Sequence, residues 1–246
     1  MMRGNPLHLH TNLSVNGLLS VFNRYSELRL ASYSKLAMRR TKEDAEKTRA
    51  SLLEAAETLF LQNGVAHTSL EQIARAAGVT RGAAYWHFQD KADLFHAMLS
   101  QVRLPPEQLT ERLSMCDQKT PLKPMRDLCI EAIENLKENP KKRRILTILL
   151  HRCEFTEELR PAQERHQAFI ETIISQFAEQ FSKAAQRGLL YPHITPLQAA
   201  YTLHTITHGL LTECTRSAVA PIWLESPQVM IDAVFRGLVL NWDPSV

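Results

Sequence analysis

The chain has 246 residues, of which 44% are hydrophobic and 22% are charged, with only 8 glycines. This length and apolar content allow one large or two small domains with a buried core, and they exclude a fibrous or wholly disordered chain. The net charge of +3 arises within residues 1–37, because the basic and acidic residues of the remaining chain balance. The overall charge therefore does not indicate nucleic-acid binding, and only the local placement of charges can do so.

Residues 1–37 show no sustained hydrophobic period, and their most apolar stretch is too broken for a signal peptide. We expect a disordered extension or an upstream start codon included in error, because a better organised segment begins at Met38; an amphipathic targeting sequence is the alternative. No apolar run reaches the roughly 18 residues that span a bilayer. The four cysteines form no C-x-x-C pair, which favours reduced thiols in an intracellular, cytoplasmic protein.

From Lys42 the pattern is helical, with one apolar face made by Leu52, Ala55, Ala56, Leu59 and Phe60. Asn63 and Gly64 are expected to end this helix. Ser69 and Gln72 fit a capping box at the start of a second, short helix that Gly78 ends. Thr80 is a suitable N-cap for a third helix that begins at Arg81, and Asp90 for a fourth.

Beyond residue 100 the sequence predicts long helices bordered by prolines, at about 122–138, 141–154, 158–187, 196–218 and 227–240. We expect Pro105 and Pro106 to interrupt or bend the fourth helix. No alternating run of strand length stands out. The predicted fold class is all-α, with about nine helices: an N-terminal three-helix unit containing a helix-turn-helix, followed by a larger helical domain.

The two short helices around Gly78 suit a helix-turn-helix, whose second helix enters the major groove of DNA. Arg81 can pair with guanine or phosphate, and Gly82 beside Ala83 would let the helix backbone approach base edges. The side chains of Thr80, Tyr85 and Lys91 can reach phosphates, and a basic arm precedes the first helix at Arg39, Arg40 and Lys42. By spacing alone, folds that never bind DNA share this arrangement.

The run Thr68–Phe88, followed by Asp90-Lys91 and Leu94-Phe95, closely resembles the DNA-binding domain of the TetR family. Residues 40–49 and 151–155 resemble its AcrR-type subgroup, the repressors of multidrug efflux genes. The resemblance begins near Met38. It implies a homodimer whose DNA-binding domain is hinged through the fourth helix to a sensor domain. Members bind palindromic operators and release DNA when a lipophilic drug-like molecule enters the sensor domain.

These considerations divide the chain into an extension (1–37), a DNA-binding domain (38–95) and a ligand-binding and dimerisation domain (96–246). The resemblance places the recognition helix at Thr80–Tyr85 and Lys91 on the DNA backbone. We expect Trp86 and Phe88 to close the core of the small domain, and His87 to form structural hydrogen bonds. The full set of candidate DNA-binding residues is Arg39, Arg40, Lys42, Ser69, Thr80, Arg81, Gly82, Ala83, Tyr85, Trp86, His87 and Lys91.

The candidate ligand-binding residues lie in the second domain: Cys129, Ile133, His151, Glu154, Phe155, Phe169, Ile173, Phe177, His204 and His208. For the apolar members, ordinary core packing is the alternative. Glu154 is either a surface ion-pair partner or a buried carboxylate that selects cationic ligands. His204 and His208 have the spacing of two metal ligands but lack a third, so hydrogen bonding in a cavity or packing seam is expected instead. The basic run 141–144 is expected to be a solvated surface.

The sequence thus predicts a ligand-responsive repressor of multidrug efflux genes. Its expected partners are an operator in double-stranded DNA, a lipophilic small-molecule inducer and a second copy of the chain, with no membrane and no cofactor or metal. The apolar stripes of the last two helices suit a dimer interface, although intramolecular core is the alternative. A DNA-binding regulator without a ligand is the main rival. An all-α enzyme is a weaker one, because no nucleophile, phosphate-binding or zinc-protease motif is present.

Overall fold

The computed structural model describes residues 42–103, 106–114, 122–216 and 226–243. The chain divides into two compact units, residues 1–49 and residues 50–246. In the first unit, residues 42–49 are helical. Met38, Arg39, Arg40 and the expected extension 1–37 lie outside the described residues, so the predictions made for them remain predictions.

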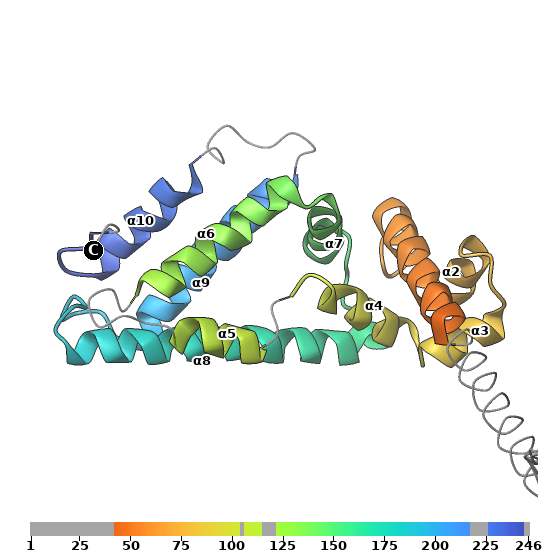
Figure 1. Ribbon diagram of the computed structural model, residues 1–246, viewed down its shortest axis with the longest axis horizontal. Helices are drawn as coiled ribbons and strands as arrows, with labels where there is room; N and C mark the ends of the chain where they lie inside the picture. The colour runs from red at the N-terminus through yellow and green to blue at the C-terminus, as the bar shows by residue number, and fades with distance from the viewer. Residues whose placement is uncertain (1–41, 104–105, 115–121, 217–225, 244–246) are drawn as a thin grey trace, which may run out of the picture. The chain divides into compact units, whose positions relative to one another are not determined.

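The second unit is helical, as the sequence predicts (Figure 1). Its first helix covers residues 50–63. It continues with α2 (Leu70–Ala76), α3 (Arg81–His87), α4 (Lys91–Ser100), α5 (Pro106–Ser114), α6 (Lys123–Glu138), α7 (Pro140–His151), the short 3₁₀ helix η1 (Glu157–Leu159), α8 (Arg160–Gln186), α9 (Pro196–Arg216) and α10 (Pro227–Leu238). Within the described ranges, extended pairing is limited to one antiparallel bridge, between Leu190 and Val239.

The caps of the short helices are those predicted. The Ser69 hydroxyl accepts a hydrogen bond from the Gln72 amide at 3.2 Å, and the Gln72 side chain accepts one from the Ser69 amide at 2.7 Å. Thr80 caps α3 through the Ala83 amide, and Asp90 caps α4 through the Asp93 amide. Gly78 lies in the turn between α2 and α3 with a φ of +70°, a conformation that side chains with a Cβ rarely adopt.

Of the two outcomes predicted for Pro105 and Pro106, a bend in the fourth helix was wrong and an interruption of the helical run was confirmed. α4 ends at Ser100, ahead of the two prolines, and is not bent by them. Pro106 instead begins α5, a helix that the sequence reading did not predict. Proline is well tolerated in a first helical turn, where its missing N–H has no partner to lose. The five later helices were confirmed with ends that differ by a few residues.

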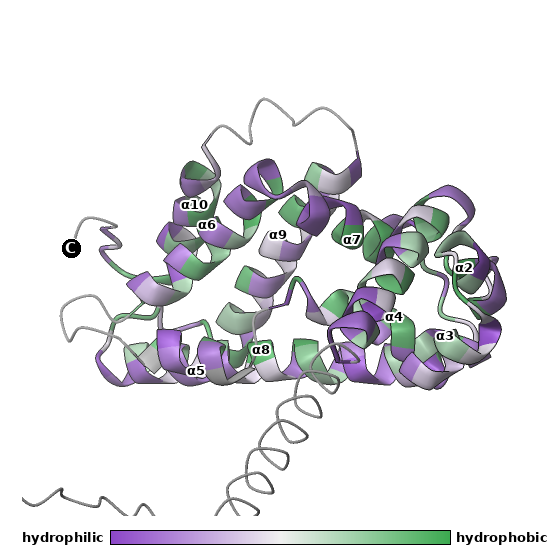
Figure 2. Ribbon diagram, turned by 45° about the vertical axis from the view of Figure 1, so that its right-hand side comes forward, coloured by the Kyte–Doolittle hydropathy of each residue, from purple (hydrophilic) through white to green (hydrophobic). Residues whose placement is uncertain are grey.

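The second unit contains two hydrophobic clusters. One combines the first four helices with Ile145, Ile148 and Leu149 of α7, Leu159 of η1 and Ala162 of α8. The other is built from α5, α6, the later part of α8, α9 and α10, and Leu146 packs against both clusters. The helices are amphipathic, and green and purple stretches alternate along α8 in Figure 2. The first cluster therefore extends past residue 95, into segments that the sequence reading assigned to the sensor domain.

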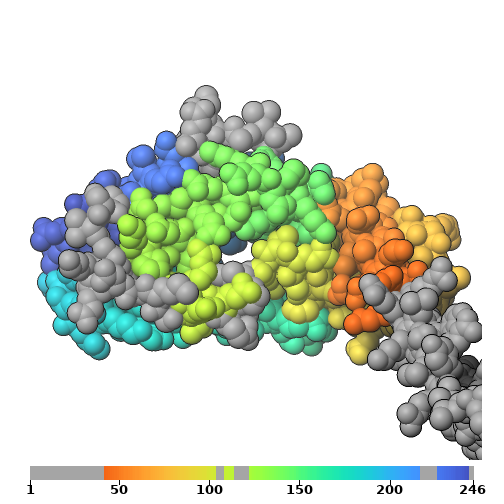
Figure 3. Space-filling model, in the orientation of Figure 1, coloured from red at the N-terminus to blue at the C-terminus, as the bar shows by residue number. Residues whose placement is uncertain are grey.

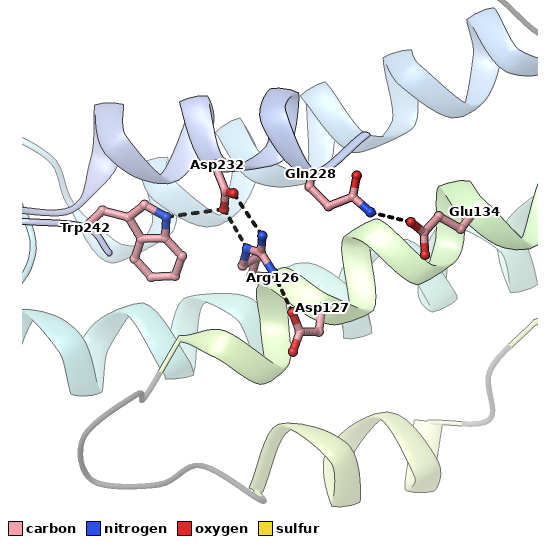
Figure 4. Close-up of polar contacts among 6 residues, drawn as sticks. All are labelled: Arg126, Asp127, Glu134, Gln228, Asp232 and Trp242. Carbon is pink, nitrogen blue, oxygen red and sulfur yellow. Dashed lines mark hydrogen bonds and ion pairs between the residues drawn. The ribbon is translucent and has the colours of Figure 1, made fainter. Parts of the chain in front are cut away.

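A polar network joins α10 to α6 and includes Trp242 (Figure 4). Arg126 of α6 binds both carboxylate oxygens of Asp232 in α10, and Trp242 donates to the same carboxylate at 3.3 Å. Gln228 of α10 donates to Glu134 of α6. Ile231 and Phe235 of α10 are buried, whereas Val229 and Arg236 are exposed. One face of α10 therefore packs inward and the other is accessible.

No described helix is long and apolar enough to cross a membrane.

Candidate functional site

The helix-turn-helix exposes one face of α3. Ile73 and Ala74 of α2 and Ala84 of α3 are buried and hold the two helices together. Tyr85 is 45% exposed and Trp86 is 74% exposed. The prediction that Trp86 closes the core was therefore wrong, whereas the same prediction for Phe88, which is 2% exposed, was confirmed. A seven-residue helix has little apolar periodicity, which is why the two rings were not distinguished.

Arg81 is the most prominent charge on this exposed face. Its guanidinium forms an ion pair with Glu71 of α2 and lies 5.4 Å from the centroid of the Tyr85 ring. Both partners leave the arginine largely exposed, so its fork of N–H donors remains accessible to an acceptor outside the chain. Glu71 was not among the predicted residues, because its contact depends on how α2 and α3 cross.

Gly82 has no packing role among the described residues. A Cβ placed on it would meet only the Thr80 hydroxyl, at 4.0 Å. Glycine within a helix costs about 1 kcal/mol relative to alanine, and no internal contact of the described residues offsets that cost. The bare backbone at Gly82, next to the partly buried Ala83, suits close approach of a large external partner such as a DNA strand.

Lys91 does not have the exposure expected of a phosphate-binding side chain. Its side chain is 3% exposed, and the ammonium lies 2.8 Å from Glu158 of η1 and 3.2 Å from the carbonyl oxygen of Ala66. The sequence reading, which followed the resemblance, placed this side chain on the DNA backbone. The long-range ion pair with Glu158 occupies it instead, and no sequence pattern indicates that contact.

The other candidate DNA-binding residues have varied settings. Ser69 and Thr80 are exposed, and their hydroxyl oxygens accept the capping hydrogen bonds described above. The His87 ring is partly buried and lies edge-on to the Trp86 ring, with 4.6 Å between centroids. Lys42 is exposed and helical in the first unit.

A second group of polar and aromatic side chains lies where α4 ends and α8 passes. Arg103 donates a hydrogen bond to Nδ1 of His166, and its guanidinium lies 4.6 Å from the centroid of the Phe169 ring. The His166 ring stacks with Phe155 at 6.3 Å. Because arginine can only donate, Nδ1 accepts and the proton of the neutral imidazole is on Nε2. Phe155 and Phe169 were predicted, whereas Arg103 and His166 were missed.

The pKa values of this group reflect burial among cations. Burial, followed by the charges of Arg103, His208 and His204, lowers the pKa of His166 to about 4. Burial and His208 also lower the pKa of His204. Burial lowers the pKa of Arg103 to about 10, so the guanidinium stays charged at neutral pH. The rings of His204 and His208 lie 6.0 Å apart, and the described residues contain no group of three ligand side chains able to hold a metal.

The remaining candidate ligand-binding residues are dispersed. Cys129, Ile133 and Phe177 are buried in the second hydrophobic cluster, and Ile173 packs against it. His151 is exposed and bonds to Thr215 of α9 at 3.0 Å. Glu154 is exposed, so the alternative of a buried carboxylate that selects cations was wrong. The free cysteines of the described chain are Cys129, Cys153 and Cys214.

A cavity of about 280 Å³ lies between the segment after α4 that contains Arg103, and α5, α6 and the start of α7. Figure 3 shows this face hollowed between the yellow end of α4 and the lime-green helices α5 and α6. The expectation of a solvated basic run at 141–144 was wrong in part, because Lys142 lines the cavity and Arg144 pairs with the buried Glu57. The lining residues are Gln101, Val102, Arg103, Gln108, Arg112, Leu128, Glu131, Ala132, Asn135, Asn139 and Lys142.

Comparison with known proteins gives matches for both the helix-turn-helix region and the larger helical region that follows it. Residues 52–98 match the family model described as bacterial regulatory proteins, tetR family, and residues 120–215 match the C-terminal region of MAATS-type transcriptional repressors. The HTH-type transcriptional regulator TtgR of Pseudomonas putida is 37% identical over 174 residues, which cover 71% of this chain and 83% of TtgR. The chain belongs to the TetR family.

Solved structures of TetR-family members support the same assignment. The crystal structure of NalD, the secondary repressor of the MexAB-OprM multidrug efflux pump in Pseudomonas aeruginosa, is 54% identical, with a TM-score of 0.76 over 81% of this chain and all of NalD. A SmeT–triclosan complex is 30% identical, with a TM-score of 0.69 over 81% of this chain and 96% of SmeT. SmeT is the repressor of the SmeDEF multidrug efflux pump of Stenotrophomonas maltophilia. These relatives are transcriptional regulators.

Proposed function

We propose that this TetR-family regulator represses multidrug efflux genes by binding a palindromic operator, and that a small molecule in its helical domain releases it. The observation that carries the proposal is the outward face of α3, where Arg81, Tyr85 and Trp86 are exposed and Gly82 has no internal packing role. The efflux target is supported by NalD and SmeT, which repress efflux pumps, and by the triclosan complex of SmeT.

The proposed contacts follow from the geometry of α3. Arg81 leaves Glu71 to bind a guanine edge or a phosphate, because the guanidinium offers several donors to either acceptor. Tyr85 donates its phenol proton to a phosphate, and the bare helix backbone at Gly82 lies closest to the bases. We expect the basic arm with Arg39, Arg40 and Lys42 to follow the DNA backbone.

Dimerisation through the last two helices is part of the proposal. Leu197, Tyr201 and Ile206 of α9 and Val229 of α10 are exposed apolar side chains. Gly209 and Gly237, which lie within these helices, have no neighbour within 4 Å of an added Cβ. Exposed apolar side chains beside helical glycines suit close packing of α9 and α10 against the same helices of a second copy. Two recognition helices can then read half-sites about 34–36 Å apart.

We infer that ligand binding affects the DNA-binding helices through the first hydrophobic cluster. Because this cluster contains residues from both sides of position 95, the two functions are not separated sharply between residues 95 and 96. Arg144 of α7 pairs with Glu57, and the Val65 amide donates to the Arg152 carbonyl at 2.9 Å. A ligand that shifts α7 or the start of α8 therefore shifts the helix-turn-helix with them. Differential binding of about 1–3 kcal/mol between the two arrangements changes operator affinity roughly 5- to 150-fold.

The test is fluorescence anisotropy with duplexes tiled across the upstream region of the chain's own gene, at two salt concentrations. We expect a tight palindromic site that is lost when a ligand is added. The double variant Arg81→Ala, Tyr85→Ala should abolish specific binding and leave the dimer folded. Wild-type operator affinity in that folded variant would refute the recognition helix, and weak, steeply salt-dependent binding everywhere would refute sequence-specific repression.

A further inference from the structure

Arg103 carries a positive charge that no described carboxylate neutralises. The described contacts of its guanidinium are the neutral His166 ring and the face of Phe169. A partly buried cation in such surroundings retains a desolvation cost that an anionic partner would offset. Arg103 is also one of the residues that line the 280 Å³ cavity.

The rest of the cavity lining adds to the positive potential. Arg112 and Lys142 are the other described cations of the lining, and Glu131 is its one described acid. Glu131 forms an ion pair with Arg112 at 2.5 Å, so its charge is already used. Glu131 also interacts electrostatically with Lys142, so among the described cations of the lining it is Arg103 that has no described acid beside it. Burial lowers the pKa of Lys142, whose ammonium would likewise be stabilised by an anion.

The lining also provides for the uncharged part of a ligand. Val102, Leu128 and Ala132 are apolar, and Asn135 and Asn139 offer amide groups. The volume is close to the lower limit of usual small-molecule sites, roughly 300–1,000 Å³. A cationic drug would find no free described carboxylate here, because Glu131 is paired and Glu154, on the segment after α7, is exposed.

We propose that this cavity binds a small aromatic acid, whose carboxylate or phenolate accepts hydrogen bonds from Arg103 and whose ring system lies against Val102, Leu128 and Ala132. This inference rests on the proposed function, because it names the chemical class of the inducer. It makes Arg103 the residue that selects anions over neutral and cationic analogues. Occupancy would act where the two hydrophobic clusters meet, since Arg103 follows α4 and contacts α8.

The test compares three probes that share one ring system: 1-naphthoate, 1-naphthamide and 1-naphthylmethylammonium. Isothermal titration calorimetry on the full chain should give naphthoate about tenfold or more tighter binding than the amide, which corresponds to about 1.4 kcal/mol. The ammonium compound should bind most weakly. Equal affinity for the acid and the amide, preference for the ammonium compound, or no binding of naphthoate would each overturn the proposal.

Variants assign the selectivity to one residue. Arg103→Met should reduce the affinity for naphthoate to that for the amide, and Arg103→Lys should retain part of the preference. Lys183→Met removes an exposed charge that pairs with Glu179 on α8 and serves as the matched control, with unchanged selectivity expected. If the methionine variant fails to fold, Arg103→Lys and Arg103→Gln replace it in the test. A preference for naphthoate over the amide that is undiminished in both variants would overturn the role of Arg103.

Operator binding is measured in parallel so that the two proposals fail separately. If the wild-type chain binds no operator but selects naphthoate, the repressor function fails while the anion site stands. If the chain binds its operator and the acid and amide release it equally, the anion site fails while the repressor function stands.

Discussion

Arg126 donates two hydrogen bonds to the Asp232 carboxylate, from Nε at 2.6 Å and from Nη2 at 2.9 Å, and so joins α6 to α10. The same guanidinium contacts Asp127, and the Trp242 indole completes the carboxylate's partners. The hydrogen bonds from Arg126 hold the pKa of Asp232 below its ordinary value. This carboxylate therefore helps to position α10, and with it the proposed dimer face, together with the Gln228–Glu134 hydrogen bond and the buried side chains of Ile231 and Phe235.

We expect Asp232→Asn to reduce the free energy of unfolding by on the order of 3 kcal/mol at pH 7, because the partly buried Arg126 loses its two-point carboxylate partner and keeps only Asp127. Since the folded pKa of Asp232 is lowered, its contribution is complete above the unfolded pKa of about 3.9 and is lost as the pH falls through the folded value. Urea unfolding at several pH values should therefore show the difference between wild type and variant narrowing below about pH 4. A gap that stays constant down to pH 2 would contradict this, and Glu179→Gln, at an exposed pair, is the control.

Gly82→Ala should stabilise the chain and weaken operator binding together. Alanine is favoured over glycine in a helix by about 1 kcal/mol, and the added Cβ meets nothing closer than 4.0 Å within the chain. If DNA approaches the bare backbone at this position, the methyl group obstructs it. Thermal melts and anisotropy on the same preparations check both effects, and Lys183→Met, at an exposed ion pair on α8, should leave operator affinity unchanged. Unchanged operator affinity for Gly82→Ala would show that the bases lie farther from Gly82.

Lys91→Met distinguishes an internal role from a phosphate contact. Each phosphate contact adds about 0.9 to the slope of log affinity against log salt concentration. Because the Lys91 ammonium binds Glu158 and the Ala66 carbonyl, we expect the variant to lose about 1 kcal/mol of stability with an unchanged salt slope. A slope lower by about one unit would mean that Lys91 leaves Glu158 when the chain binds DNA. Lys183→Met provides the comparison for a distant lysine.

Val229→Glu should disrupt the dimer without unfolding the protomer. The side chain is 63% exposed, so a carboxylate at this position can stay in water in the free protomer. Placed against its symmetry mate in the proposed interface, the charge would be desolvated and would face a like charge. Sedimentation velocity should show monomers, and circular dichroism should show unchanged helix content. A dimer that persists would move the interface away from this face of α10.

Local chemistry made the first half of the fold predictable. The caps at Ser69, Thr80 and Asp90 each depend on residues three positions apart, and all three form as the sequence indicates. α5 was missed because it is short and polar and begins at the second of two consecutive prolines. The placement of Trp86 failed because α3 is too short for its apolar residues to define a face.

The site predictions depended on separation along the chain. Phe155 and Phe169 could be proposed from an aromatic pattern. The side chains that contact them, His166 and Arg103, are 63 residues apart in the chain and could not. Lys91 finds Glu158 in the same way, through the packing of α4 on η1. Such contacts depend on how distant helices pack, which periodicity within one helix does not encode.

The extent of the first hydrophobic cluster determines where the DNA-binding part of this protein can be separated and fused to another domain. A fragment that ended at residue 100 would leave the helix-turn-helix without Ile145, Ile148 and Leu159, and its inner face would be open to water. A chimera that transplants this DNA-binding head onto another sensor should therefore carry α7, η1 and the first turn of α8 along with it. The transferable module is discontinuous in sequence, and a splice at the boundary of the family's N-terminal region would divide it.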